Sequence, residues 1–590
     1  MTNRFRISGG AGIGPSISIV ACALIVVSAV AIGRGQSGAR RWVPVTDAML
    51  QKPDPSDWLM WRRTLDGWGY SPLNQITRAN VSQLKMAWTR GLIGPGNQEG
   101  TPLIHDGVMI IPNPGDNIVA VEATTGDLLW EYRRKLPEGV RPKTSRTVAI
   151  WGNLIINSSS DNMMYALDAQ TGALVWETKV LDANKRAPTS GGPIIANGKV
   201  ITGRQCQPDA GRDSCVVTAH DAKTGKELWR FHTIPGPGEP GYESWGDVPM
   251  EQRWHVGTWM VPSYDPELNL IYVGTSVTIP APKFTLGGND KQHLYHNCTL
   301  AINADTGKIV WYYQHIVDHW DLDHPFERLL VDTVVAPRAS DVRWINPRVR
   351  AGERRKVITG IPGKTGVVYT LDRQTGEFLW ARPTVMQNVI SNIDGATGKV
   401  IVNPEVLFTK INEEKFVCPG SSGGKNWPAG AYSPLTNAMY MPMQNMCMTA
   451  TTTVDTRDPS KVYGLNMKQE FAIGADKVGT VWSISAETGQ TLWKHEQRAG
   501  MLSLMATGGG LVFGGDSNGR FKALDDKTGA VLWETIVGSP ASGYPVSFSV
   551  GGKQYVAAIV GPSLEANSTR GLTPELKTGN GPNIFVFALP

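Results

Sequence analysis

A nine-residue stretch, VDHWDLDHP at residues 317–325, gathers side chains that could do chemistry. Asp321 and Asp323 flank a single residue, and His319 and His324 lie beside them. A carboxylate can serve as a general base or bind a hard cation, whereas histidines prefer transition metals. Taken alone, the stretch fits a metal site, a catalytic base, a pair of hydrolase carboxylates or a polar turn. The rest of the chain has to decide between them.

The composition is that of a globular protein with a large core. Of the 590 residues, 41% are hydrophobic and 18% are charged, which is an ordinary balance. The 65 glycines, 39 prolines and 20 tryptophans favour an all-β protein with many turns. The net charge of +5 is small, and the sequence has no basic run with interleaved aromatic residues. Nucleic acid is therefore not expected as a partner.

The N-terminus has the features of a secretion signal. Arg4 and Arg6 precede an apolar run at residues 17–32 that closes on a small-x-small site. This pattern predicts a cleaved signal peptide over residues 1–31, a periplasmic location and an N-terminal extension over residues 32–57. An uncleaved membrane anchor is the alternative, although the run is short of the roughly 20 residues that a bilayer span needs. No other segment is apolar enough to span a membrane.

Five cysteines remain once Cys22 leaves with the signal peptide. Disulfides are allowed in an oxidising compartment. The candidate pairs are Cys206 with Cys215 and Cys418 with Cys447. Cys298 is left over and is expected to be a buried strand thiol. The sequence has no C-x-x-C-H motif, so this chain is not expected to carry a c-type haem.

One pattern recurs seven times: a small residue, x, often Asp, x, x, Thr-Gly, three residues, Trp. The copies lie at residues 120–130, 166–176, 219–229, 301–311, 370–380, 483–493 and 523–533. We interpret each copy as a β-hairpin in which Asp caps the turn and Gly takes a positive φ. The large Trp ring is expected to pack against a neighbouring unit.

The spacing of the repeats predicts a propeller. The shortest distances between the repeat glycines are about 40 to 53 residues, the length of a four-stranded blade. Two wider gaps are expected to hide degenerate copies without Trp, at residues 264–274 and 432–442. We therefore predict one eight-bladed β-propeller with tryptophan-docking repeats over residues 58–590, closed by pairing of N- and C-terminal strands. Its long loops are where a site is expected.

The repeats, the secretion signal and the Trp-Asp motif together resemble the type I quinoprotein alcohol dehydrogenases, in their haem-free branch. The resemblance covers nearly the whole mature chain, from about Trp58 to the end. It implies a propeller that holds pyrroloquinoline quinone (PQQ) and a metal ion, Ca²⁺ or a lanthanide, at its axis. It further implies a periplasmic enzyme that oxidises an alcohol, of a bulky or secondary kind, to a ketone or aldehyde. A soluble cytochrome c would take the electrons.

The same resemblance implies roles for individual residues. Asp321 matches the catalytic base, which also contacts the metal and takes the alcohol proton as hydride moves to the quinone. Lys364, in GIPGKTGVVYTLD, matches the cation at the reactive carbonyls, where a fixed positive charge stabilises developing negative charge. Trp259 matches the tryptophan that stacks under the flat cofactor. The other implied PQQ contacts are Glu99, Arg146, Thr189 or Ser190, and Asn426.

The metal site is where the chain departs from the family. Asp323 matches an added ligand of lanthanide-using members, yet WDxD also suits calcium-type relatives, so the metal stays open. Residues 203–215 replace the loop that usually supplies a Glu ligand, and Val277 stands at the usual Asn ligand. Replacement oxygens are predicted on Asp209, Ser276 and Thr278. His319 and His324 are interpreted as loop residues, because hard ions seldom choose imidazole.

One further departure, one further match and two rival classes complete the comparison. Residues 140–146 lack the adjacent cysteines that often form a ring-like disulfide over PQQ, whereas Cys418 and Cys447 fall where the family has a structural disulfide. A non-catalytic propeller scaffold of the outer-membrane assembly type is the main alternative, and the ordered set of cofactor residues argues against it. A hydrolase with Asp321 and Asp323 as paired carboxylates is the second. Neighbouring positions on one loop are a poor layout for an opposed acid and base.

Overall fold

The computed structural model describes residues 42–94, 96–279, 281–317, 320–453 and 464–590. The predicted signal peptide over residues 1–31 and His319 lie outside these residues. The part from Trp42 to Pro590 is one compact unit, and it is built almost entirely of strands, as the all-β prediction requires. The proposed boundary of the propeller domain at residue 58 stays a prediction. Residues before it are nonetheless packed in place, since Val45 bridges Gly152.

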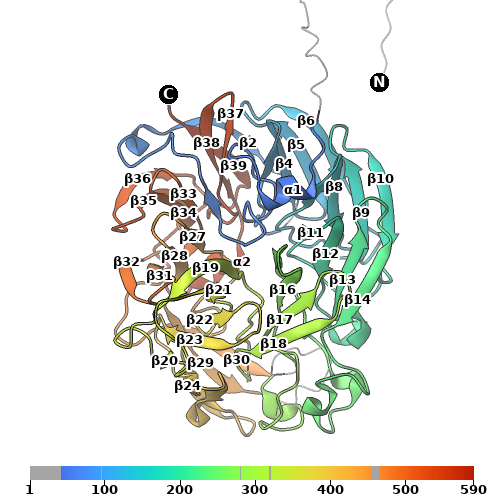
Figure 1. The fold of residues 1–590 in the computed structure, drawn as a ribbon, viewed down its shortest axis with the longest axis vertical. Coiled ribbons are helices and arrows are strands. Elements are labelled where there is room, and N and C mark those ends of the chain that lie inside the picture. Colours follow the sequence, from blue (N-terminus) through green and yellow to red (C-terminus); the bar gives the residue numbers. More distant parts are fainter. Residues whose placement is uncertain (1–41, 95, 280, 318–319, 454–463) are drawn as a thin grey trace, which may run out of the picture. The chain divides into compact units, whose positions relative to one another are not determined.

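Among the described residues, eight sheets of four or five strands make up most of this unit, and their strand pairs are antiparallel except for β1 with β33. In chain order, the first sheet contains β3(Leu103–His105), β4(Val108–Asn113), β5(Asn117–Glu122) and β6(Leu128–Arg133), and the second contains β7(Ala149–Trp151), β8(Leu154–Ser158), β9(Met163–Asp168) and β10(Leu174–Lys179). The third contains β11(Ile194–Ala196), β12(Lys199–Gly203), β13(Val216–Asp221) and β14(Glu227–His232), and the fourth contains β15(Ser263–Asp265), β16(Leu270–Gly274), β17(Cys298–Asn303) and β18(Ile309–Gln314). Figure 1 shows these sheets following one another in chain order, from blue to green.

The remaining four large sheets contain the second half of the chain. They are β19(Leu329–Val335), β21(Glu353–Gly360), β22(Val367–Asp372), β23(Phe378–Pro383) and β20(Trp344–Ile345); β27(Ala431–Ser433), β28(Ala438–Gln444), β31(Gly479–Ser485) and β32(Thr491–Gln497); β1(Tyr70–Ser71), β33(Met501–Thr507), β34(Leu511–Asp516), β35(Arg520–Asp525) and β36(Val531–Ile536); and β37(Val546–Val550), β38(Lys553–Val560), β39(Asn583–Ala588) and β2(Lys85–Gly91). In the last of these, β2 pairs with β39 near the C-terminus. The expected pairing of N- and C-terminal strands is therefore present.

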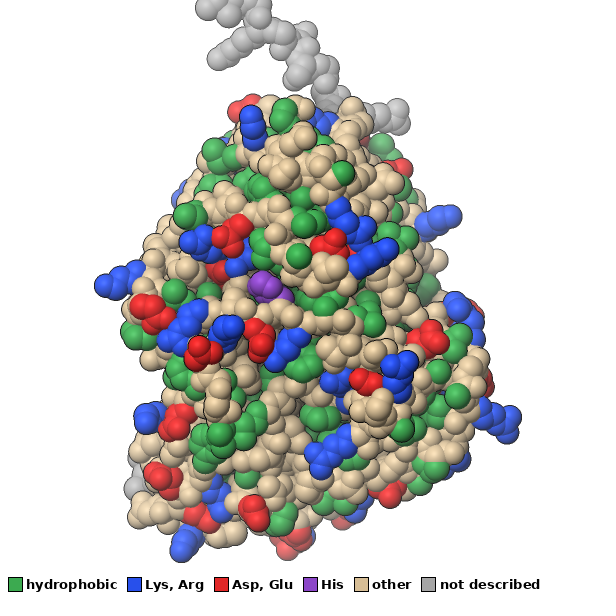
Figure 2. Space-filling model, turned by 90° about the vertical axis from the view of Figure 1, so that its left-hand side faces the viewer, with side chains coloured by type: hydrophobic (Ala, Val, Ile, Leu, Met, Phe, Trp, Pro, Cys, Tyr) green, Lys and Arg blue, Asp and Glu red, His purple; other side chains and the backbone are tan. Residues whose placement is uncertain are grey.

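Two smaller sheets and two α-helices of the described chain lie outside these eight sheets. They are the sheet of β24(Ile390–Ile393) and β25(Val400–Val402), the sheet of β26(Glu414–Val417), β29(Met446–Thr452) and β30(Leu465–Phe471), and the α-helices α1(Asp47–Gln51) and α2(Leu564–Arg570). No helix in the described residues is both long and apolar enough to cross a membrane. Figure 2 shows acidic and basic side chains interspersed on one face, in keeping with the small net charge.

The expectation of degenerate repeats in the two wide gaps was wrong. Residues 264–274 and 432–442 span the hairpins β15–β16 and β27–β28. Each is the first half of a sheet whose second half already carries a Trp repeat, at residues 301–311 and 483–493. The gaps are wide because long loops and two small sheets are inserted there, and the eighth large sheet comes instead from the two ends of the chain.

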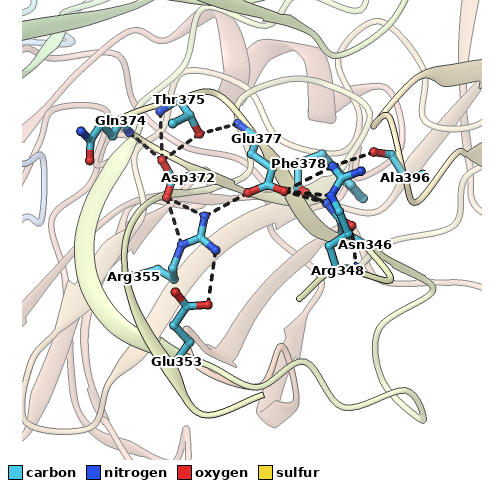
Figure 3. A network of polar contacts seen from close by, with 10 residues as sticks. All are labelled: Asn346, Arg348, Glu353, Arg355, Asp372, Gln374, Thr375, Glu377, Phe378 and Ala396. Atoms are coloured by element: carbon cyan, nitrogen blue, oxygen red, sulfur yellow. Dashed lines mark hydrogen bonds and ion pairs between the residues drawn. The ribbon is translucent and has the colours of Figure 1, made fainter. Parts of the chain in front are cut away.

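The repeat forms the predicted hairpin turn. In the copy between β22 and β23, Asp372 Oδ1 accepts hydrogen bonds from the Gln374 and Thr375 N–H groups at 3.0 and 2.9 Å. The other Asp372 oxygen accepts from Arg355 at 2.8 Å, and Arg355 also pairs with Glu377 at 3.0 Å. Figure 3 shows this network around the turn. The turn is thus fixed by its own side chains, as an Asx-type turn requires.

In the described chain, six of the seven repeat tryptophans, all except Trp533, dock on the turn glycine of the next sheet. Trp311 of β18 is 9% exposed and lies against Gly376, where an added Cβ would be 2.7 Å from the indole ring. Its Nε1–H donates to the Arg373 carbonyl at 3.2 Å. Trp88, Trp130, Trp229 and Trp493 make the same bond to the equivalent carbonyl of the sheet that follows. The glycine is required because the ring occupies the place of a side chain.

We expect Trp311→Ala to lower the free energy of unfolding by about 3 kcal/mol, because it removes a buried aromatic ring and its hydrogen bond between two sheets. Val310→Ala is the matched control, since Val310 is the preceding residue of β18 and is 54% exposed. It should change stability by less than about 0.5 kcal/mol. Urea unfolding followed by fluorescence measures both. Equal effects of the two substitutions would contradict the docking role.

Antiparallel order sorts the loops into two ends. In each large sheet, the loop entering the first strand and the loop joining the second to the third strand emerge at the same end, which we call the loop end. The Trp-repeat turns join the third to the fourth strand and lie at the opposite end. Because the Trp-repeat turns use one end for docking between sheets, a functional site is expected at the loop end.

Candidate functional site

The predicted catalytic, cofactor and metal residues all precede the first strand of a sheet or follow its second strand, and so belong to the loop end. Glu99, Arg146, Thr189, Ser190, Trp259, Asp321 and Asp323 precede the first strands β3, β7, β11, β15 and β19, and Asn426 precedes β27. Ser276, Thr278, Lys364 and Asp209 follow the second strands β16, β21 and β12. Residues up to 327 positions apart in the chain, Glu99 and Asn426, therefore belong to the same kind of loop.

Lys364 joins the two aspartates of the opening stretch. Its ammonium Nζ lies 2.7 Å from Asp321 Oδ1 and 3.8 Å from Asp323 Oδ2. The backbone reinforces this arrangement, because the Lys364 N–H donates to the Asp323 carbonyl at 3.0 Å. The Val277 N–H donates to Asp323 Oδ1 at 2.8 Å. Asp321 is only partly buried, and a partly exposed carboxylate held in place by a lysine can serve as a proton acceptor.

The hydroxyls predicted as replacement metal ligands point elsewhere. Ser276 Oγ donates to the His255 carbonyl at 2.6 Å and accepts from the Gly257 N–H at 2.9 Å. Thr278 Oγ1 donates to the Trp254 carbonyl at 3.3 Å. Both hydroxyls are thus engaged with the backbone of one loop. Asp209 lies in the 3-10 helix Pro208–Ala210, and its side chain is outside what the structure describes.

Two histidines near the aspartates are buried and neutral. Burial lowers the pKa of His255 to about 4, and its ring is held by the Val277 carbonyl at 3.1 Å and the Gln205 amide at 2.7 Å. Burial likewise lowers the pKa of His324 to about 3. Its Nδ1–H donates to the Leu322 carbonyl at 2.6 Å. These rings shape the loop around the aspartates.

Arg146 is the centre of a second cluster. It donates to Glu99 Oε2 and to Ser190 Oγ, each at 2.5 Å. Its guanidinium carbon lies 5.3 Å from the ring centres of both Trp259 and Trp427. Burial raises the pKa of Glu99, and the Arg146 charge opposes this shift. The cluster offers a fixed cation flanked by aromatic rings, which suits a flat anionic ligand.

The tryptophan pair gives this cluster an apolar wall. Trp259 and Trp427 lie 6.3 Å apart at 68°, and Trp259 also meets Phe326 at 5.6 Å. Trp259 is only partly buried, whereas Trp427 is 7% exposed. Ser190 Oγ lies 3.2 Å from the Trp259 carbonyl, which ties the Arg146 cluster to the wall. Sequence reasoning missed Trp427, although it directly follows the predicted Asn426 and could have been found there.

Some residues of these loops carry buried polar atoms that have no hydrogen-bond partner among the described residues. Within the described part of the chain, Glu99 Oε1, Arg146 Nε, Thr258 Oγ1 and Glu565 Oε1 are buried and make no hydrogen bond. Such groups are costly unless a bound molecule satisfies them. Thr258 and Glu565 were not anticipated from the sequence. The orphaned atoms and the aromatic wall fit a polar, planar ligand such as PQQ.

Asn426 and Thr189 are buried in the same region, at 6% and 2% exposure. The Asn426 side chain caps its own loop, with Oδ1 accepting from the Trp427 N–H at 3.0 Å. The preceding Lys425 forms a fully buried ion pair with Glu327 at 2.6 Å. This ion pair links the loop before β27 to the loop of the aspartates, because Glu327 also accepts from the Gly430 N–H at 2.7 Å.

A hard cation has two carboxylates available among the described residues. Asp321 and Asp323 suit such an ion chemically, although it would compete with the Lys364 ammonium for their oxygens. In the part of the chain that the structure describes, no group of three or more His, Cys, Asp or Glu side chains is arranged for a metal. Asp321 and Asp323 are therefore the two ligands that the described residues offer to a hard cation.

Both predicted disulfides are present, which confirms the two pairings. Cys206 bonds Cys215 across nine residues, and Cys418 bonds Cys447 across 29. The first braces the loop that replaces the family's Glu-bearing loop, and the second joins β29 to the segment before Asn426. Cys298 is a buried free thiol, as expected.

Comparison with known proteins agrees with this geometry. The family "PQQ: Glucose/ethanol/alcohol dehydrogenase, beta-propeller domain" matches residues 58–392 and 460–556. The dehydrogenase subunit of the quinone alcohol dehydrogenase of Komagataeibacter europaeus is 32% identical, over 87% of this chain and 73% of that protein. The quinoprotein alcohol dehydrogenase PedH of Pseudomonas putida is 29% identical, over 91% and 92%.

A solved europium-containing methanol dehydrogenase has a TM-score of 0.80 and 28% identity, over 92% of this chain and 99% of that one. The matched residues include every loop that carries the two clusters except the one before β27. The non-catalytic scaffold alternative finds no support among these relatives, all of which are named as dehydrogenases. The chain belongs to the PQQ-dependent alcohol dehydrogenase family of β-propeller proteins, and it is an oxidoreductase of the quinoprotein alcohol dehydrogenase type.

Proposed function

We propose that the protein is an eight-bladed propeller that binds PQQ and a hard cation, Ca²⁺ or a lanthanide, and oxidises a bulky or secondary alcohol. The eight large sheets support the blade number. The observation that carries the proposal is the meeting of two clusters: an ion pair of Lys364 with Asp321, and Arg146 flanked by Trp259 and Trp427. The first cluster offers acid–base chemistry and the second a seat for a flat anion.

In this proposal Arg146 binds a carboxylate of PQQ, while Trp259 lies along the face of the ring system. Asn426 and Glu99 bind polar edges of the same group, and Thr189 or Ser190 supplies a hydroxyl. Bound PQQ supplies the two-electron acceptor that the reaction needs. Lys364 is positioned to stabilise negative charge at the reactive carbonyls, because its ammonium is fixed beside Asp321.

Asp321 is the proposed general base. Its Oδ1 is held by Lys364 at 2.7 Å, so the substrate hydroxyl proton would go to Oδ2. The ion pair fixes the orientation of the carboxylate before substrate arrives, which lowers the entropic cost of reaching a reactive geometry. The half-buried position of Asp321 excludes most water while leaving one side open to an alcohol.

The metal ion is proposed to bind Asp321 and Asp323, whose carboxylates match a hard cation in charge and ligand type. An ion there would add Lewis-acid character next to the quinone. Asp209, Ser276 and Thr278 stay candidates for the remaining ligands, although the hydroxyls of Ser276 and Thr278 donate to backbone carbonyls.

The setting of the enzyme is also a proposal. The N-terminal signal pattern and the two disulfides support a periplasmic location. The sequence has no c-type haem motif, so electrons are proposed to leave singly to a soluble cytochrome c. The sequence around Asp321 and the absence of a c-type haem motif support a bulky or secondary alcohol as the substrate.

Reconstitution tests the proposed function. The purified chain is incubated with PQQ and either Ca²⁺ or a lanthanide, and a panel of primary, secondary and bulky alcohols is screened with an artificial dye acceptor. Stoichiometric PQQ uptake and dye reduction that requires both PQQ and a metal are expected. Turnover of a substrate without PQQ or an electron acceptor would instead revive the hydrolase alternative.

Asp323→Asn should weaken activation by the metal about tenfold or more, because it removes one of two carboxylate charges from the proposed site. The loss should be larger for a trivalent lanthanide than for Ca²⁺. Metal titrations of PQQ-loaded enzyme give the half-activating concentrations. Ser276→Ala is the matched control, since the Ser276 hydroxyl is bonded to the His255 carbonyl, and its metal titration should be unchanged. Identical titrations for Asp323→Asn and wild type would remove Asp323 from the metal site.

A further inference from the structure

The helix α2 (Leu564–Arg570) fills the connection between β38 and β39, at the loop end of the sheet that joins the two chain ends. Ser563 caps it, with its Oγ accepting from the Ala566 N–H at 3.4 Å. The first two side chains of the helix differ in exposure. Leu564 is 58% exposed, whereas Glu565 is 1% exposed. The helix therefore delivers one carboxyl group to the interior.

The carboxyl group of Glu565 reaches the same residues that form the candidate site. The Asn426 side chain and the charged groups of Lys364, Lys425 and Glu99 face it. These come from three other loops, before β22, β27 and β3. Glu565 Oε1 is buried and has no hydrogen-bond partner among the described residues. Within the part of the molecule that the structure describes, Glu565 Oε1 is thus a polar atom without a hydrogen-bond partner, and it faces the residues proposed to bind the quinone.

Glu565 has no ion-pair partner within 4 Å in the described part of the chain, although two lysines face it more distantly. Burial raises the pKa of Glu565 to about 8, the Glu99 carboxylate adds to the rise, and Lys364, Asn426 and Lys425 oppose it. At neutral pH the group is therefore protonated and carries an O–H that can donate a hydrogen bond.

We propose that Glu565 is a cofactor-binding residue whose carboxyl group donates a hydrogen bond to an oxygen of PQQ bound between Lys364, Asn426 and Glu99. The inference rests on the proposed function and extends it to a residue outside the sequence motifs. PQQ has carboxylate and carbonyl oxygens that accept hydrogen bonds. A neutral donor satisfies one of them without adding a like charge beside a polyanion, as an ionised glutamate would.

The test is the equilibrium affinity of the full-length protein for PQQ, followed by quenching of tryptophan fluorescence at pH 7. Glu565→Ala should raise the Kd about tenfold, the expected effect of losing one hydrogen bond to a charged or strongly polar ligand. Glu565→Gln keeps an N–H donor and should stay within about threefold of wild type. Leu564→Ala, on the exposed side of the same turn, is the matched control and should leave the Kd unchanged.

A second measurement follows the Kd across pH 6 to 10. In wild type the Kd should be constant below pH about 8 and should rise above it, because the ionised form loses its donor and repels the ligand. Bound PQQ holds the proton more tightly, so ligand binding is coupled to proton uptake in that window. Glu565→Gln should not show this rise, and it provides the test if Glu565→Ala fails to fold.

The outcomes separate the two proposals. Wild-type protein that does not bind PQQ would overturn the proposed function itself. Wild type that binds PQQ, with folded Glu565→Ala at the same Kd or with Glu565→Gln retaining the full alkaline rise, would overturn the role of Glu565 alone. A change confined to the KM for the alcohol, with an unchanged PQQ Kd, would also overturn it, because the residue would then contact substrate and not the cofactor.

Discussion

Asp321→Asn is expected to fold, bind PQQ and lose turnover. An amide cannot take the hydroxyl proton, and removing a general base typically costs a factor of roughly 10² to 10⁴ in rate. The geometry supports retention of the fold, because an asparagine oxygen can still accept the hydrogen bond that Lys364 donates at 2.7 Å. The readouts are kcat with a dye acceptor and the PQQ content of the same sample.

Asp247→Asn is the control for this substitution, since Asp247 is an exposed carboxylate in a surface loop. It should retain wild-type kcat. A near-normal kcat in PQQ-loaded Asp321→Asn would remove the proposed base. Loss of both turnover and PQQ would show instead that Asp321 serves mainly to hold the site together, through Lys364 or the metal.

Arg146→Met should nearly abolish PQQ binding. Arg146 is the buried cation that lies 5.3 Å from the ring centres of Trp259 and Trp427. Truncating one partner of a buried, hydrogen-bonded charge pair costs about 2 to 5 kcal/mol, so the Kd should rise by a factor of roughly 30 to 4,000. The substitution also leaves Glu99 buried without the cation that it meets at 2.5 Å. Quenching of tryptophan fluorescence measures the Kd, and thermal unfolding measures the stability.

Two companion variants separate binding from folding in this experiment. Arg146→Lys keeps the charge but loses the planar fork, and it should bind PQQ more weakly than wild type and more tightly than Arg146→Met. Arg146→Met combined with Glu99→Gln should recover stability, because the orphaned carboxylate is gone, while PQQ binding stays weak. Wild-type affinity in the folded double variant would contradict a direct contact between Arg146 and the cofactor.

The fold could be predicted from the sequence because its repeat is a local signal. The Asp that caps the turn, the positive-φ glycine and the Trp lie within eleven residues, so their hairpin needs no distant information. The eighth large sheet has no such signal: β37, β38 and β39 join β2 from the other end of the chain. The sequence therefore predicts extra repeats at two hairpins without Trp, although these hairpins are the first halves of sheets that already carry a Trp repeat.

The candidate site could be predicted where a residue sits in a recognisable stretch. Asp321, Lys364 and Arg146 were found in this way, and the structure brings Asp321 and Lys364 to 2.7 Å. Glu565 lies in a helix with no motif, and its burial follows from packing against loops more than a hundred residues away. The hydroxyl of Ser276 was a reasonable ligand by position, but the backbone of the His255 loop engages it.

The sequence by itself determined the hairpin repeat and the order of the chemical residues along the chain, since both are read from residues close together in sequence. It identified the two cysteine pairs as candidates, which the structure confirms. Only the tertiary structure decided which loops meet. Antiparallel strand order places the loops before the first strands and after the second strands at one end, and close packing of those loops then sets every distance in the site. That is why Lys364 could be named from the sequence, whereas its position beside both Asp321 and Asp323 could not.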